Sequence, residues 1–174
     1  LGVTCGLAGR CRALRWEDLD KVFCCRWPDQ RASDHAQTPD QAIWFGTLEG
    51  LSRFDGADWT GYTPVQGEST SPEKIRTLCV ARDSSLWIGY SSQARGVTRY
   101  DGTTWIRYTT DDGLDNDIVW QIYQSQDGDF WFGLERGLSR FDGGTWSTYS
   151  PEESPIPFGR IRSIGEMPDG VLWL

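Results

Sequence analysis

One motif recurs along this chain at nearly constant spacing, and it limits the folds that the chain can adopt. In the copy at 130–149, an apolar pair is followed by glycine, a Leu-Ser-Arg-Phe run, an Asp-Gly turn, a tryptophan and a tyrosine. The first tryptophan of the motif stands at Trp44, Trp87, Trp131 and Trp173, at intervals of 43, 44 and 42 residues. A period of this length is typical of stacked or radial repeats, so the 174 residues should hold about four units.

Each complete period is predicted to contain four short antiparallel strands separated by polar turns. The expected strands are 43–47, 86–90 and 130–134, then 51–54, 97–100 and 138–141, then the segments with Trp59 and Tyr62, Trp105 and Tyr108, and Trp146 and Tyr149, and finally 75–80, 118–124 and 161–166. Four strands in forty-odd residues make one propeller blade. We therefore predict an all-β fold, a β-propeller built of four-stranded antiparallel blades. The strand after the long connection should be innermost, and the strand with the Trp/Tyr pair outermost.

The repeated residues have structural interpretations. Asp55-Gly56, Asp101-Gly102 and Asp142-Gly143 are typical of tight hairpin turns, because glycine tolerates a left-handed backbone. Trp44, Trp87 and Trp131 recur at one register and are expected to fill the space between adjacent blades, not to bind a ligand.

The repeat divides the chain into two regions. Residues 1–39 form a divergent or irregular N-terminal segment, in which Trp16 could mark the outer strands of a blade. Residues 40–174 hold the propeller repeats, at 40–72, 73–116, 117–159 and, in part, 160–174.

The strings RGVTRYDGTTWIRYTTDDGLDNDIV and FWFGLERGLSRFDGGTW resemble the two-component regulator propeller repeat. This resemblance covers 40–174 and implies a seven-bladed propeller in the periplasmic or extracellular sensor portion of bacterial hybrid two-component systems. It also implies that the propeller senses small-molecule or oligosaccharide ligands and acts in a homodimer. We expect the chain to be a fragment of such a propeller. The alternative is a four-bladed ring closed by Leu1 to Trp16.

The composition limits the kinds of partner that we expect for this segment. The formal charge of −8 argues against nucleic acid, and no apolar run is long enough to span a membrane, so we expect neither partner for this segment. The five cysteines form neither a disulfide framework nor a zinc-site pattern. No cofactor or metal site is indicated.

Catalysis has little support in the sequence. His35 is the one histidine and lies far from any nucleophile motif. Streptogramin lyases are propellers that resemble this repeat too, but their chemistry depends on histidine and a divalent metal. We therefore predict a chain that is not an enzyme and has no catalytic residues. A propeller lyase or hydrolase and a structural protein-interaction propeller are kept as alternatives.

The residues that differ between copies are the candidates for binding. When the copies are aligned, Arg76, Trp120 and Arg162 share one register of the innermost strand, between constant apolar positions. Connections between the second and third strands should lie on the same face and add Tyr90, Arg95, Glu135 and Arg136. Arginine can hydrogen-bond carboxylates or sugar hydroxyls, and tryptophan can stack on a sugar. The sequence therefore predicts an extracytoplasmic ligand-sensing module whose site faces the central channel.

Overall fold

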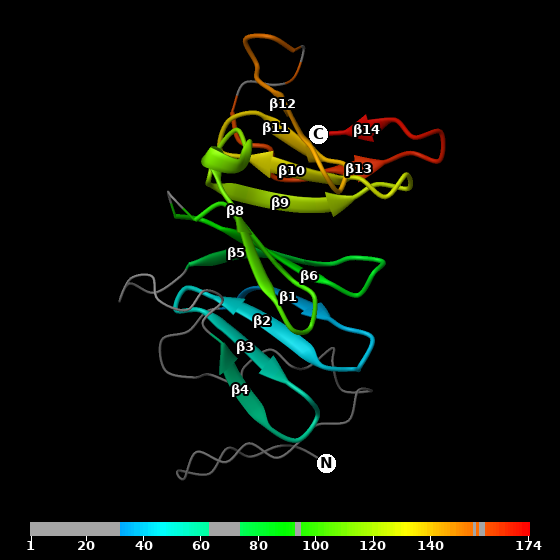
Figure 1. The fold of residues 1–174 in the computed structure, drawn as a ribbon. Coiled ribbons are helices and arrows are strands. Elements are labelled where there is room, and N and C mark those ends of the chain that lie inside the picture. Colours follow the sequence, from blue (N-terminus) through cyan, green and yellow to red (C-terminus); the bar gives the residue numbers. More distant parts are fainter. Residues whose placement is uncertain (1–31, 63–73, 93–94, 155, 157–158) are drawn as a thin grey trace.

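The computed structural model describes residues 32–62, 74–92, 95–154, 156 and 159–174. These residues form three four-stranded antiparallel sheets and one two-stranded sheet, stacked one beside another (Figure 1). The strands of the first sheet are β1 (Ala32–Gln37), β2 (Ile43–Thr47), β3 (Leu51–Phe54) and β4 (Trp59–Tyr62). Those of the second are β5 (Ile75–Val80), β6 (Leu86–Tyr90), β7 (Val97–Tyr100) and β8 (Trp105–Tyr108).

The third sheet repeats the pattern. It consists of β9 (Val119–Gln124), β10 (Phe130–Leu134), β11 (Leu138–Phe141) and β12 (Trp146–Tyr149), and β13 (Gly165–Glu166) pairs with β14 (Leu172–Trp173). In each complete sheet the strands lie in chain order, so a sheet is one up-and-down blade. The predicted all-β propeller architecture is confirmed. One 3-10 turn, η2 (Thr110–Asp112), follows β8.

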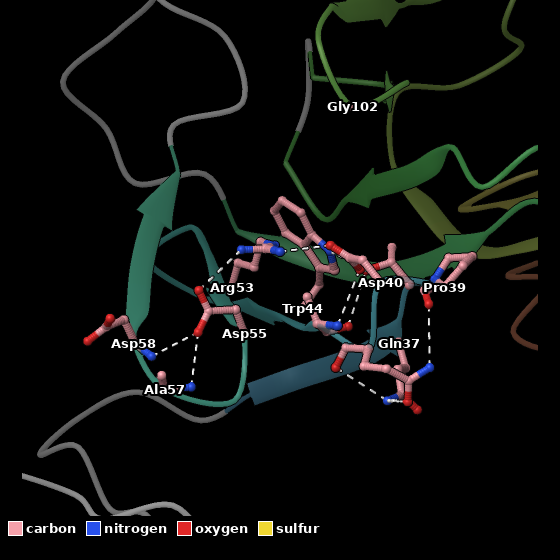
Figure 2. Close-up of polar contacts among 12 residues, drawn as sticks. Gln37, Pro39, Asp40, Trp44, Arg53, Asp55, Ala57, Asp58 and Gly102 are labelled. Atoms are coloured by element: carbon pink, nitrogen blue, oxygen red, sulfur yellow. Dashed lines mark hydrogen bonds and ion pairs between the residues drawn. The ribbon is translucent and has the colours of Figure 1, made fainter.

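The Asp-Gly turns have the predicted backbone. Gly56, Gly102 and Gly143 adopt φ values of 100°, 101° and 100°, the left-handed region that glycine tolerates. Figure 2 shows the first of these turns, in which Asp55 Oδ1 accepts hydrogen bonds from the backbone N–H groups of Ala57 and Asp58, at 3.0 and 2.9 Å. These bonds fix the hairpin between β3 and β4.

A second turn, between the first two strands of each blade, is held by an ion pair. Arg53 on β3 reaches Asp40 at 2.7 Å, across the turn that joins β1 to β2 (Figure 2). Arg99 contacts Asp83 at 2.8 Å at the matching place in the second blade. In the third blade Arg140 pairs with Asp129. These pairs are partly exposed, so they are worth little individually.

The motif tryptophans fill the blade interfaces as predicted. Trp87 is 1% exposed, and its ring lies 4.4 Å from Phe130 and 5.7 Å from Phe132 of the third blade, measured between centroids. Trp44 of the first blade contacts Tyr100 of the second at 5.9 Å. Trp131 is half-buried beside Ile161 and Ile164, which precede β13. The core is therefore divided among the interfaces between successive blades.

Glycine in the second strand lets the next blade approach. A Cβ added to Gly46 would lie 2.4 Å from Ile75, and one added to Gly133 would lie 2.5 Å from the carbonyl oxygen of Ile161. Gly89 faces Val119 in the same way. The first apolar residue of β5 and of β9, and Ile161 before β13, thus each pack on a glycine of the preceding blade. β5 also contacts β1 of the first blade and β9 of the third, as expected for strands that lie innermost in their blades.

Two strands, β1 and β13, do not have the bounds that the sequence predicted. The first blade begins at β1, inside the segment that the repeat left as irregular, because Asp34 to Gln37 pair in register with residues of β2. A strand was expected over 161–166, but only Gly165 and Glu166 form one, since only they have partners in β14. Trp16 and the ring-closing role of 1–16 lie outside the described residues.

Candidate functional site

The candidate site begins at a β-bulge that recurs in the innermost strands. In the second blade the register of β5 against β6 shifts between Ile75 and Thr77, which leaves Arg76 as the extra residue. In the third blade it shifts at the same place, so the extra residue of β9 is Trp120. Bulges are enriched next to functional sites, because they redirect one side chain out of the alternating pattern. The position whose residue varies between repeats is therefore the position whose side chain the bulge redirects.

Ile161 continues this pattern before the fourth unit. Its backbone N–H donates to the carbonyl of Leu134 at 3.1 Å, and it packs on Gly133 as Val119 packs on Gly89. Arg162 therefore follows Ile161 as Trp120 follows Val119.

The structure brings the three predicted inner-strand residues together. The guanidinium carbon of Arg76 lies 4.0 Å from the centroid of the Trp120 ring, and that of Arg162 lies 5.2 Å from it. Arg160 is a third cation at this ring, at 4.9 Å. All three distances are within the range of cation–π attraction. The Trp120 ring of the third blade is thus the centre of a group of positive charges contributed by the second blade and the fourth unit.

Glu135 completes this group from the connection between β10 and β11. One carboxylate oxygen accepts a hydrogen bond from Trp120 Nε1 at 2.7 Å, and both accept from Arg160 Nε, at 2.8 and 2.9 Å. The hydrogen bond from Arg160, with that from the indole, lowers the pKa of Glu135, so this carboxylate is ionised at neutral pH. We call Arg76, Trp120, Glu135, Arg160 and Arg162 the Trp120 cluster.

Backbone contacts hold the loops around the cluster on one face. Glu135 N–H donates to the carbonyl of Ile118, at the entrance to β9, and Ser91 N–H donates to that of Lys74, at the entrance to β5. In the second and third blades the connection between the second and third strands thus lies beside the connection into the innermost strand. This is the arrangement that the sequence predicted for the binding face.

The structure corrects the predicted position of Tyr90. Tyr90 was placed on the binding face, but its ring is 0% exposed and lies in the core between the first two blades. Side chains two residues apart share one face of a strand, so Tyr90 follows Ile88 into this interface. Its hydroxyl lies 3.1 Å from Thr98 Oγ1.

Arg95 and Arg136 lie in the predicted connections but outside the Trp120 cluster. Arg95 is half-buried between β6 and β7, while Arg136 is exposed and lies 3.6 Å from Glu152. Within the described ranges, neither makes a cation–π contact with Trp120. Sequence reasoning missed Arg160, although the aligned positions Lys74 and Ile118 mark this register as variable too.

Among the described residues, the other chemically reactive side chains form no further site. Cys79 is the one cysteine in the described part of the chain, and burial, with a smaller effect of Asp34, raises the pKa of its thiol to about 11. His35 is exposed on β1, with its ring 6.5 Å from that of Phe45. The described segments contain no group of three or more His, Cys, Asp and Glu residues that could hold a metal ion. They also contain no helix with the length and apolar character needed to cross a membrane.

The blades, their order and the repeated bulge define the class of the protein as a β-propeller. Residues 113–136 match the two component regulator propeller family, which confirms the resemblance drawn from the sequence. The matched residues include Trp120 and Glu135. No curated protein sequence matches the chain.

Solved structures support the same architecture. The chain is similar to the extracellular domain of a hybrid two component system from B. thetaiotaomicron, with a TM-score of 0.68 and 17% identity over 82% of this chain and 20% of that one. The extracellular domain of a one component system from the same organism has a TM-score of 0.65 and 18% identity, over 82% of this chain and 19% of that one. A catalytically inactive virginiamycin B lyase from Staphylococcus aureus, solved with quinupristin, has a TM-score of 0.65 and 19% identity, over 83% of this chain and 48% of that one.

At these identities the similarity shows the fold alone. The chain spans about a fifth of the two extracellular domains and about half of the lyase.

Proposed function

We propose that this chain is an extracytoplasmic ligand-sensing β-propeller module of a bacterial two-component signalling protein, and that it recognises oligosaccharides. The observation that carries this proposal is the Trp120 cluster. Its members come from the second and third blades and from the segment before β13, so a ligand there would contact successive units at once. A ligand that bridges blades can change how they sit against one another, which is what a sensor requires.

The family match and the two extracellular domains support this function over a cytoplasmic one. By the same resemblance, the whole propeller is seven-bladed and acts as a homodimer whose arrangement responds to ligand. Light scattering of the full chain with and without ligand measures that response.

Binding is tested by screening the full chain on a glycan array and measuring hits by calorimetry, with Trp120→Ala as the variant. We expect the change to weaken binding about tenfold or more, the equivalent of about 1.4 kcal/mol, because the Trp120 ring contacts all three arginines of the cluster. Trp59→Ala is the matched control, because Trp59 is 52% exposed on the outermost strand of the first blade. Equal affinity in wild type and Trp120→Ala would remove the cluster from the site.

The alternatives are tested with the same preparation. Turnover of quinupristin or another cyclic depsipeptide would favour a lyase, and its loss in His35→Ala would assign the residue responsible. Retention of a protein partner by a chain that binds no array component would favour a structural interaction module.

A further inference from the structure

Two guanidinium groups of the Trp120 cluster, those of Arg76 and Arg162, form no ion pair with any of the described residues, although Arg162 is close enough to Glu135 to help lower the pKa of that carboxyl. Arg160 is neutralised by Glu135 at 2.8 Å. Among the described residues, no carboxylate lies within ion-pair distance of Arg76 or Arg162. The chain as a whole is acidic, with 25 acidic residues against 17 basic ones. The cluster is therefore a local positive site in a protein of formal charge −8.

The arginines on the third strands are arranged differently. Arg53, Arg99 and Arg140 each contact an aspartate of their own blade. Arg76 of the second blade and Arg162 of the fourth unit instead lie on either side of the third blade in chain order, 4.0 and 5.2 Å from the ring centroid of its Trp120. Their like charges repel, and an anion bound close to both would reduce that repulsion.

The indole is not an open platform for a neutral sugar. Trp120 is half-buried, its Nε1–H is bonded to Glu135, and its ring already contacts three guanidinium groups. A sugar that stacked on it would have to displace an arginine. The ring serves better to hold Arg76 and Arg162 in position, which leaves their N–H groups to select the ligand.

We infer that the Trp120 cluster binds an anionic ligand whose carboxylate or sulfate group is held by Arg76 and Arg162, with Trp120 positioning both. This deepens the proposed function and rests on it. A guanidinium group is planar and presents two parallel N–H donors, so it matches a carboxylate or sulfate better than a hydroxyl group. The ligand class is then an oligosaccharide that carries uronate or sulfate groups.

Glu135 has a distinct role in this arrangement. It restrains Arg160 and reduces the positive charge at the site. Replacing it with glutamine frees a third cation, so Glu135→Gln should tighten anion binding several-fold. If Glu135 instead accepted hydrogen bonds from sugar hydroxyls, the same variant would bind more weakly. The direction of this change separates the two kinds of site.

The test is calorimetry of the full chain with trigalacturonate, a sulfated chondroitin disaccharide, inorganic sulfate and neutral maltotriose. We expect at least one anionic saccharide to bind, maltotriose not to bind, and affinity to fall as NaCl is raised. Arg76→Gln and Arg162→Gln should each weaken binding about tenfold, and Arg162→Lys should recover part of the loss. Arg136→Gln, on the exposed neighbouring connection, should have no effect. Circular dichroism of each variant checks that it is folded.

The outcomes separate this inference from the proposed function. Anionic binding that survives Arg76→Gln and Arg162→Gln would overturn the inference, as would binding of inorganic sulfate alone at the affinity of the saccharides. Maltotriose binding that is lost in Trp120→Ala but kept in both arginine variants would leave the proposed function standing and reject an anionic ligand. Failure of all four probes would reject the anionic class, and the wider array would then decide the proposed function.

Discussion

Val119 occupies the space that a side chain at position 89 would need. A Cβ on Gly89 would lie 2.9 Å from Val119 Cγ1 of the next blade and 2.7 Å from Thr77 Cγ2 of its own. The absence of a side chain at position 89 therefore sets how closely the second and third blades approach. The same relation joins Gly46 to Ile75 and Gly133 to Ile161, so it is a repeated element of the blade interface.

Gly89→Ala should therefore destabilise the fold. We expect a loss of about 1–3 kcal/mol in the free energy of unfolding, the usual cost of overpacking a core. Gly61→Ala is the control, because Gly61 lies in β4 with no atom within 4 Å of the added Cβ. Urea denaturation followed by circular dichroism measures both. Equal stability of the two variants would show that the blades can separate without cost.

Replacing Ser84 with glycine should stabilise the fold. Ser84 has a φ of 69°, and Gly128 occupies the matching turn of the third blade with a φ of 101°. A left-handed backbone costs a residue with a side chain about 1–2 kcal/mol, part of which is offset by the greater unfolded-state freedom of glycine. Ser84→Gly should raise stability by up to about 1 kcal/mol, and Gly128→Ala should lower it by a similar amount. Changes of the same sign in thermal denaturation would contradict this.

Two buried tryptophans should respond differently to loss of the indole N–H. Trp44 Nε1 donates to Thr38 Oγ1 at 3.2 Å, whereas Trp87 Nε1 has no partner in the part of the chain that the structure describes. Trp44→Phe and Trp87→Phe remove similar volumes, so their cavity costs nearly cancel in the comparison. We expect Trp44→Phe to be the more destabilising by about 1 kcal/mol, the contribution of one hydrogen bond. Chemical denaturation of the pair tests this, and a larger loss for Trp87→Phe would show that its N–H is satisfied.

Local sequence signals predicted much of this fold. Asp-Gly pairs specify their hairpins through the glycine backbone, and the apolar runs specify strands, because both effects act over a few residues. Alignment of the copies also identified the register of Arg76 and Trp120. It could not show that this register is a β-bulge, because the shift depends on pairing with the second strand.

The missed contacts depend on neighbouring units. Tyr90 is buried because the first blade covers it, and Arg160 enters the cluster because Glu135 and Trp120 lie beside it. Nothing in the sequence next to either residue records such partners. β1 was missed for a related reason, since Asp34 and His35 interrupt its apolar pattern and its register is set by β2.

The two turn aspartates, Asp101 and Asp142, should make stability fall in acid. Hydrogen bonds lower their pKa values from 3.8 to about 2, chiefly from the Thr104 backbone N–H to Asp101 and from the Thr145 hydroxyl to Asp142. The pKa is lower in the folded state, so the unfolded chain takes up the proton first. The contribution of each carboxylate is therefore complete above about pH 4 and is lost as the pH falls towards about 2.

Asp101→Asn and Asp142→Asn should flatten the pH dependence of the melting temperature over this range, because the amide does not titrate. Asp127→Asn is the matched control: Asp127 lies in an exposed turn and accepts no hydrogen bond within the described residues. Its melting curve should keep the wild-type pH dependence. If the Asp142→Asn variant lost stability between about pH 4 and 2 as steeply as wild type, the acid sensitivity would belong to other carboxylates.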